Sequence, residues 1–341
     1  MRGFKNILLL SSALLLASCN RPPEIIKLTG QAQGTSWSIS FWTDKPVAAQ
    51  QLQLAIENEF SRIDQLMSTY RDDSVISQFN QQHSLQPVTV GEELVQLVEH
   101  ARLISQATAG CYDLTVQPLF ELWGFKANQF NQPEVTEINQ TLSSTGLQHV
   151  TSRGSDTLTK AISTLQIDVS SIAQGYSVER LAAMMQQYGV VNYLVEIGGE
   201  LITNGHKPDN TPWRIAIERP LPGAQTLYKV LQMTTEQQAA VMTSGTYRHY
   251  FSADGKRFSH IIDGRTGWPV QHNTVSVTVV HSNATLADAW STALLCVGRA
   301  QGLALAEEHQ LAVLFIDEHN GDLQQHSSAL WQKSDLFTEA Q

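Results

Sequence analysis

Residues 259–269 read SHIIDGRTGWP, and residues 287–292, which follow the next expected strand, read ADAWST. The first run carries His260 on an apolar strand into a glycine-rich turn. The second run opens a stretch rich in Ala, Leu and Ser, which predicts a helix. On a helix, Asp288 and Thr292 lie one turn apart on the same face. A carboxylate and a hydroxyl so placed suit Mg²⁺, although a helix-start Asp and a packed Thr would look the same.

The rest of the chain predicts helices alternating with strands in its first half and short strands clustered in its second half. Leu28–Thr43 alternates polar and apolar residues and predicts one half-buried strand. Amphipathic helices are expected after Pro46 and over Glu92–Thr108. The other expected elements are helices over 174–188 and 284–296 and strands over 166–170, 193–197, 213–218, 228–233, 239–243, 258–263, 274–280 and 312–317. This order favours an α+β fold with mixed, largely antiparallel sheets and flanking helices.

Residues 1–18 predict a signal peptide. Arg2 and Lys5 precede a short apolar run that ends in LASC at Cys19. The run is too short to span a bilayer as an ordinary transmembrane helix. We therefore expect cleavage before Cys19 and lipidation of that cysteine, with residues 19–29 as a tether and residues 30–335 as the functional domain. A plain secretory signal with a coincidental cysteine is the alternative.

The chain is acidic, with a formal net charge of −10 over 341 residues. An acidic chain without a basic run argues against nucleic-acid binding and against charge-driven binding to an anionic membrane. Two cysteines remain after the leader, Cys111 and Cys296. An oxidising compartment permits a disulfide, but each cysteine lies in an apolar stretch of a different segment. We therefore expect two buried free thiols.

Further segments carry side chains suited to ligand binding. Residues 168–176 place hydroxyls and small residues at the start of a helix, where backbone N–H groups bind phosphate; helix capping by the serines is the alternative. Tyr70 and Tyr112 flank polar turns and can stack on a flat ring, or they are core tyrosines. His260 has an ordinary pKa suited to a base, although a lone histidine on a strand is usually structural.

A set of short motifs, in a shared order, resembles the ApbE family of FAD:protein FMN transferases. The motifs are GTSW (34–37), MSTY (67–70), DLTVQPL with LWGF (113–119, 122–125), IDVSSIAQGY (167–176), GG (198–199), TSG (243–245) and the two runs quoted above. Each motif alone is weak, but their order is specific. The resemblance spans roughly residues 30–335 and implies an ApbE-like fold whose domain binds FAD.

The resemblance assigns roles to individual residues. It makes His260 the general base and makes Asp288, Thr292 and the Ala173 carbonyl the ligands of Mg²⁺. It implies that FAD is bound by Gln33, Tyr70, Cys111, Tyr112, Asp113, Ser170, Gln174 and Ile261, with Asp113 accepting a hydrogen bond from the adenosine or the flavin edge. Relatives often carry Met at position 33 and Lys at position 174, so this chain has one positive charge fewer for the phosphates.

The implied activity is Mg²⁺-dependent transfer of FMN from FAD to a Thr or Ser hydroxyl of an acceptor flavoprotein, with release of AMP. Acceptors in the family are subunits of respiratory complexes such as the sodium-pumping NADH:quinone reductase and the Rnf complex. We therefore expect a lipid-anchored protein on the periplasmic face of the inner membrane. The alternatives are a Mg²⁺-dependent FAD pyrophosphatase and a non-enzymatic flavin-binding lipoprotein; the metal-like spacing of Asp288 and Thr292 argues against a transporter's binding lipoprotein.

Overall fold

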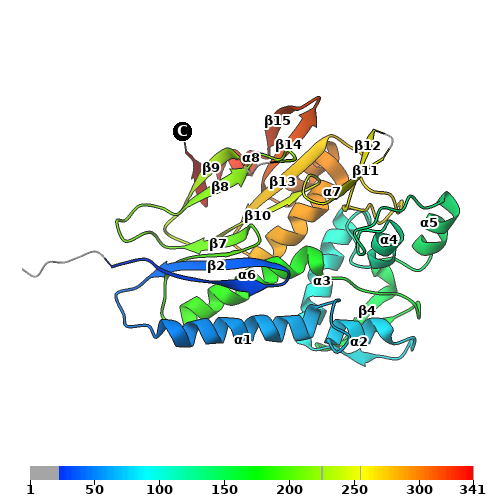
Figure 1. Cartoon of the computed structure of the whole chain (residues 1–341), viewed down its shortest axis with the longest axis horizontal. Helices are drawn as coiled ribbons and strands as arrows, with labels where there is room; N and C mark the ends of the chain where they lie inside the picture. The colour runs from blue at the N-terminus through cyan, green and yellow to red at the C-terminus, as the bar shows by residue number, and fades with distance from the viewer. Residues whose placement is uncertain (1–22, 224–225, 254, 341) are drawn as a thin grey trace, which may run out of the picture.

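The computed structural model describes residues 23–223, 226–253 and 255–340. Its central feature is an 8-stranded sheet in which each neighbouring pair is antiparallel (Figure 1). In spatial order the strands are β1 (Ile26–Ala32), β2 (Thr35–Trp42), β6 (Asn192–Ile197), β7 (Glu200–Asn204), β10 (Ala239–Gly245), β13 (Thr274–His281), β14 (Ala312–His319) and β15 (Asp322–Ser327). The expected α+β class with largely antiparallel strands is confirmed.

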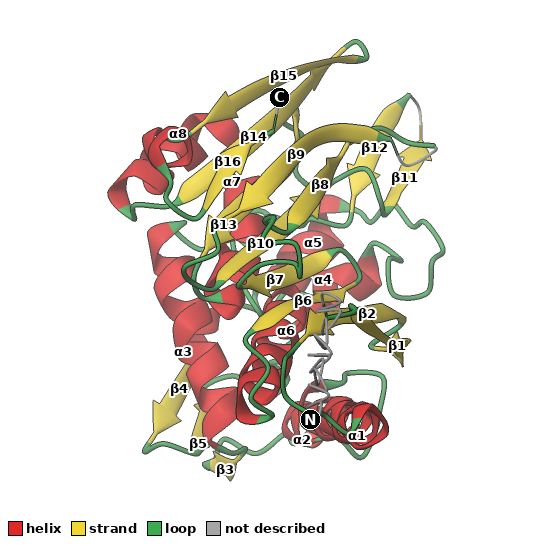
Figure 2. Cartoon of the chain, turned by 90° about the vertical axis from the view of Figure 1, so that its left-hand side faces the viewer, coloured by secondary structure: helices red, strands yellow, loops and turns green. Residues whose placement is uncertain are grey.

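Helices cover one face of this sheet (Figure 2). The long ones are α1 (Ala49–Met67), α3 (Glu92–Ala107), α6 (Ser170–Gln187) and α7 (Ala284–Glu308). Ile39, Val195 and Val277 of the sheet are fully buried against apolar side chains of these helices. The shorter elements on this side are α2 (Val75–Gln81), β3 (Val88–Thr89), α4 (Gln117–Leu122), α5 (Val135–Leu142), the 3-10 helix η1 (Leu147–His149), β4 (Val150–Arg153) and β5 (Thr157–Lys160).

A smaller sheet covers the other face. It consists of β8 (Arg214–Glu218), β9 (Leu227–Met233) and β16 (Phe337–Glu339), with α8 (Ala329–Lys333) beside it. Val241 and Leu314 of the large sheet are buried in this second core. Because both faces of the large sheet are covered, β13 is buried along nearly its whole length. A hairpin of β11 (Tyr250–Ala253) and β12 (Lys256–Ser259) adds a third small core with α4 and α5.

The expected single strand over 28–43 is wrong, because the chain turns in its middle. β1 pairs with β2 so that Ala32 lies opposite Thr35, which leaves Gln33 and Gly34 as a two-residue turn. Both have positive φ, 52° and 74°, as a tight hairpin turn requires. The alternation within β2 was correctly predicted, since its odd-numbered apolar residues are buried. The turn brings Gln33 to the carboxyl end of α1 and the start of α6, where the candidate site lies.

Other helices and strands begin or end at different residues from those expected from the sequence. The expected strand over 166–170 is absent, and α6 begins at Ser170 rather than at residue 174. The strand expected to reach Asp263 ends at Ser259, so His260 lies in the following loop. α7 continues to Glu308, past the expected end, with a break at Gly298 (φ 72°). Among the residues that the structure describes, no helix is long and apolar enough to cross a membrane.

Candidate active site

A cavity of about 860 Å³ lies between the helix layer and the ends of the sheet strands. Its volume is typical of a site for a large small-molecule ligand. It is lined by every site residue that the sequence predicted within the described part of the chain: Gln33, Tyr70, Cys111, Tyr112, Asp113, Ser170, Ala173, Gln174, His260, Ile261, Asp288 and Thr292. Cys19 lies outside the described residues. Residues more than 250 positions apart therefore share one site, although their individual roles stay predictions.

Asp288 is held in place by the packing of α6 against α7. The Asn283 side chain accepts from the Leu286 N–H (2.7 Å) and starts α7. Gly175 of α6 lies so close to α7 that a Cβ there would be 2.5 Å from the Asp288 Cβ. This approach lets the Gly175 N–H donate to Asp288 Oδ2 (2.7 Å). Burial raises the pKa of Asp288 to about 7.

Thr292 lies one turn further along α7 and also lines the cavity. Its Oγ1 is 2.8 Å from Ser244 Oγ, which is also 2.8 Å from Ser291 Oγ. Ser291, beside Thr292 on the helix, is fully buried, and its hydroxyl donates to the Asp288 carbonyl. Thr292 is therefore the hydroxyl that faces the cavity, as the helical spacing predicted.

Glu200 is a site residue that the sequence analysis missed. It begins β7, is buried, and its Oε2 accepts from the Thr243 N–H (3.1 Å). Burial, and next the negative charge of Asp288, raise its pKa well above its ordinary value. The signal available in the sequence was an acidic residue directly after Gly198 and Gly199 and before the apolar Leu201 and Ile202.

This donor set fits a hard divalent cation. None of the ion pairs formed by described residues involves Asp288 or Glu200. Two buried carboxylates that form no ion pair are costly unless they are protonated or bind a positive charge. Oxygens of a carboxylate, a hydroxyl and the Ala173 carbonyl are the ligands that Mg²⁺ prefers. The residues present therefore fit the predicted metal.

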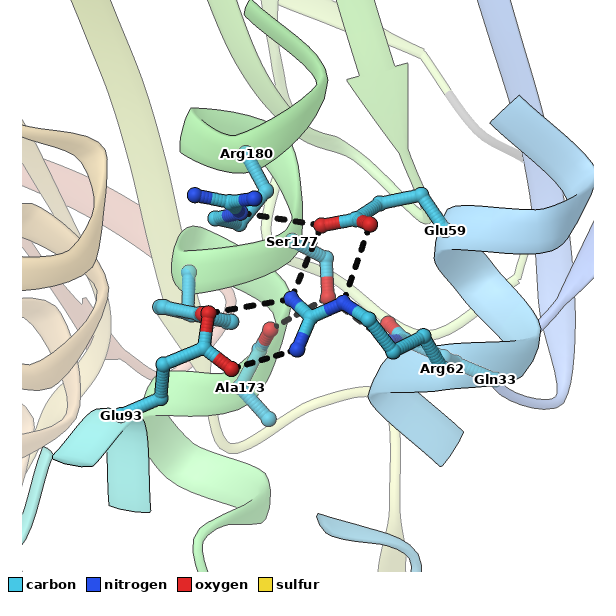
Figure 3. Close-up of polar contacts among 8 residues, drawn as sticks. Gln33, Glu59, Arg62, Glu93, Ala173, Ser177 and Arg180 are labelled. Carbon is cyan, nitrogen blue, oxygen red and sulfur yellow. Dashed lines mark hydrogen bonds and ion pairs between the residues drawn. The ribbon is translucent and has the colours of Figure 1, made fainter. Parts of the chain in front are cut away.

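Ala173 is linked to the β1–β2 turn by a short chain of hydrogen bonds, drawn in Figure 3. Gln33 Nε2 donates to Ser177 Oγ (2.7 Å), and that hydroxyl donates to the Ala173 carbonyl (2.7 Å). Gln33 Oε1 is buried and accepts no hydrogen bond from any residue that the structure describes.

An ion-pair cluster beside this chain ties three helices together (Figure 3). Arg62 of α1 pairs with Glu59 on its own helix and with Glu93 of α3. Arg180 of α6 pairs with the same Glu59 (2.9 Å). These contacts tie the middle of α6 to α1, and α1 to α3, beside the candidate site.

His260 is oriented as a base. Its Nδ1 lies 2.9 Å from the His249 carbonyl, which can only accept, so Nδ1 carries the hydrogen and Nε2 is left to take a proton. The two imidazole rings stack with centroids 5.5 Å apart, and Phe120 meets the His260 ring edge-on. Burial lowers the pKa of His260 to about 4. The expected ordinary pKa is therefore wrong, and the imidazole is neutral at pH 7.

The predicted flavin-binding residues differ in exposure. Tyr70 is 83% exposed after α1 and can stack on a ligand, whereas Tyr112 is buried and its hydroxyl accepts from Ser171 Oγ (3.1 Å). Asp113 accepts from Thr115 and from the Leu147 N–H, which indicates that it shapes its loop. The serines that start α6 provide no side-chain cap, so the capping alternative is wrong.

Cys111 and Cys296 form a disulfide, with Cα atoms 6.0 Å apart, so the expectation of free thiols is wrong. Packing of α7 beside the 111–113 segment brings the two cysteines together, which their separate apolar surroundings could not reveal. The SHIIDGRTG motif docks on the same segment, since the Gly264 N–H donates to the Cys111 carbonyl (3.0 Å). Within that motif Asp263 pairs with Arg265 (2.7 Å), so this arginine stabilises its own turn.

Comparisons with known proteins find similar sequences over most of this chain. A sequence model described as "ApbE family" matches residues 33–315. An FAD:protein FMN transferase of Vibrio cholerae serotype O1 is 38% identical over 323 residues, covering 94% of this chain and 96% of the relative. A protein of the same name from Escherichia coli K12 is 35% identical, with 92% of each chain covered.

Two solved structures share the fold. The flavin transferase ApbE from Vibrio cholerae superposes with a TM-score of 0.83 at 36% identity, covering 92% of this chain and 99% of that one. The apo form of the Pseudomonas stutzeri flavinyl transferase ApbE also gives 0.83, at 34% identity, covering 91% of this chain and 96% of that one. The expected ApbE-like fold is thus confirmed.

Proposed function

Because this chain belongs to the ApbE family, we propose that it is an enzyme that transfers FMN from FAD to a hydroxyl group of an acceptor protein. The observation that carries the proposal is that a neutral, oriented histidine and a group of buried oxygen ligands line one cavity of suitable size. Phosphoryl transfer needs these two things, a proton acceptor and a means of neutralising phosphate charge.

The reaction proceeds by attack on the FMN side of the FAD pyrophosphate. The hydroxyl of an acceptor Thr or Ser approaches the phosphorus, and His260 Nε2 takes its proton. The new bond joins the acceptor oxygen to phosphorus, the bond from phosphorus to the bridging oxygen breaks, and AMP leaves with that electron pair. The hydrogen bond to the His249 carbonyl keeps the ring in the tautomer that can accept.

Asp288, Thr292 and the Ala173 carbonyl would hold Mg²⁺ in this site, with Glu200 close to Asp288. When bound, the ion supplies positive charge to the phosphate oxygens. The chain positions its ligands through the Gly175 N–H on Asp288 and through Ser244 on Thr292. Burial of the carboxylates removes competing water and strengthens their attraction for a cation.

The acceptors that we propose are flavoprotein subunits of respiratory complexes such as the sodium-pumping NADH:quinone reductase and the Rnf complex. The transferase domain spans residues 30–335 and is anchored through lipid on Cys19 at the periplasmic face of the inner membrane. The leader pattern of residues 1–19 supports this anchor, and the resemblance of the domain supports the acceptor class.

Mass spectrometry of a candidate acceptor incubated with this protein, FAD and Mg²⁺ tests the proposal. The expected result is an acceptor Thr or Ser that gains the mass of FMN, together with one AMP per modified residue. Release of FMN and AMP without labelled protein would instead indicate an FAD pyrophosphatase. FAD that stays bound and intact would indicate a flavin carrier.

A further inference from the structure

Arg248 is the only lysine or arginine among the described residues that line the cavity. The same lining includes five acidic side chains: Asp64, Asp113, Asp168, Glu200 and Asp288. A ligand with two phosphate groups brings at least two further negative charges. Within the described part of this cavity, the phosphates of such a ligand can therefore contact a lysine or arginine side chain only at Arg248.

The guanidinium of Arg248 lies over the Gly198–Gly199 turn. Its Nη1 donates to the Gly198 carbonyl (3.3 Å), and its Nη2 donates to Glu218 Oε2 (2.8 Å). A Cβ at Gly199 would lie 3.5 Å from Nη1, so the glycine leaves room for the planar guanidinium group. The neutral Gln174 amide lies on the same turn, since a Cβ at Gly198 would be 3.2 Å from its Nε2.

These two hydrogen bonds leave most of the N–H donors of the Arg248 guanidinium free to bind a ligand. It has five N–H donors, and the side chain remains 50% exposed. A partly exposed ion pair such as Arg248–Glu218 adds little to stability, but it holds the fork in one orientation beside the cavity. The turn that it covers leads directly into Glu200, and the charge of Arg248 acts on this buried carboxyl of the candidate metal site.

We propose that Arg248 binds the pyrophosphate of FAD and supplies the positive side-chain charge of that subsite. The planar fork suits two phosphate oxygens at once, which a lysine at this position would not match. The inference rests on the proposed function, because it takes FAD as the substrate. It adds the residue that recognises the phosphates, which neither the motifs nor the metal ligands identify.

Affinity measurements with ligands that carry phosphate and with related ligands that lack it test this inference. Arg248→Gln and Arg248→Lys are compared with the wild type for FAD against riboflavin and for ADP against adenosine. Arg248→Gln should lower the affinity for FAD and for ADP roughly tenfold to a hundredfold, as expected for a lost charge-assisted contact. The affinities for riboflavin and adenosine should change less than about twofold. Arg248→Lys should recover part of the lost affinity. The affinity for FAD should depend less on salt concentration in Arg248→Gln than in the wild type.

Glu218→Gln is the matched control, because it removes the ion pair and keeps the cation. This variant should lower FAD affinity much less than Arg248→Gln does, because it removes only the contact that orients the guanidinium. Arg248→Gln with unchanged FAD and ADP affinity would overturn the inference. So would equal weakening of riboflavin, or equal weakening by Glu218→Gln, since either would indicate a structural tie. Wild-type protein that binds FAD through Arg248 but never labels an acceptor would refute the proposed transfer and leave the binding role standing.

Discussion

Replacing Cys111 and Cys296 by alanine, singly and together, tests how much stability the disulfide contributes. The cross-link joins residues 185 positions apart. In the chain-entropy description, a loop of that length removes unfolded-state entropy worth about 5 kcal/mol at 25 °C. An unfolding entropy of about 2.1 cal/mol/K per residue over 341 residues converts this loss into a Tm lower by about 7 °C.

The assay is thermal unfolding of the four proteins, followed by circular dichroism at one scan rate. Either single variant breaks the cross-link, so each should lose nearly the full amount. The double variant should lose little more, because the second substitution only removes a buried thiol. The coupling free energy between the two substitutions should therefore be close to the full loss of stability that one substitution causes. Small and additive decreases in Tm would refute the reasoning and restore the interpretation of two free thiols.

The remaining predictions concern the site and the leader. His260→Ala should bind FAD as before but transfer FMN on the order of 10²–10⁴-fold more slowly; near-normal transfer would place the base elsewhere. Burial lowers the pKa of His260 to about 4, so the imidazole stays neutral above that pH. Transfer measured at saturating Mg²⁺, which keeps Asp288 deprotonated, should therefore decrease only as pH falls through about 4, and a decrease centred near pH 6.5 under that condition would contradict the buried environment of His260. Asp288→Asn should abolish Mg²⁺ binding, measured by calorimetry, and nearly all transfer, while FAD affinity changes less; activity that survives both this substitution and EDTA would exclude the metal. Cys19→Ala should release the protein from membranes or leave an unprocessed precursor, and normal retention in cell fractionation would argue against the lipid anchor.

The sequence by itself determined the local periods and the short motifs. Alternation in β2, helical spacing in α1 and α3 and the i, i+4 pair on α7 are set by side-chain direction along a strand or helix, which depends on neighbours within one or two turns. The same local information identified the short motifs, and residues from each of them line one cavity.

Only the tertiary structure determined which of those segments are in contact and how the contacts change their chemistry. The disulfide depends on α7 lying beside the 111–113 segment, and the burial of Glu200 depends on β7 lying within the sheet close to Asp288. The pKa of His260 depends on the aromatic side chains and the His249 ring packed around it. Contacts of this kind join residues far apart in the chain, so their distances, desolvation and charges exist only after the elements have packed.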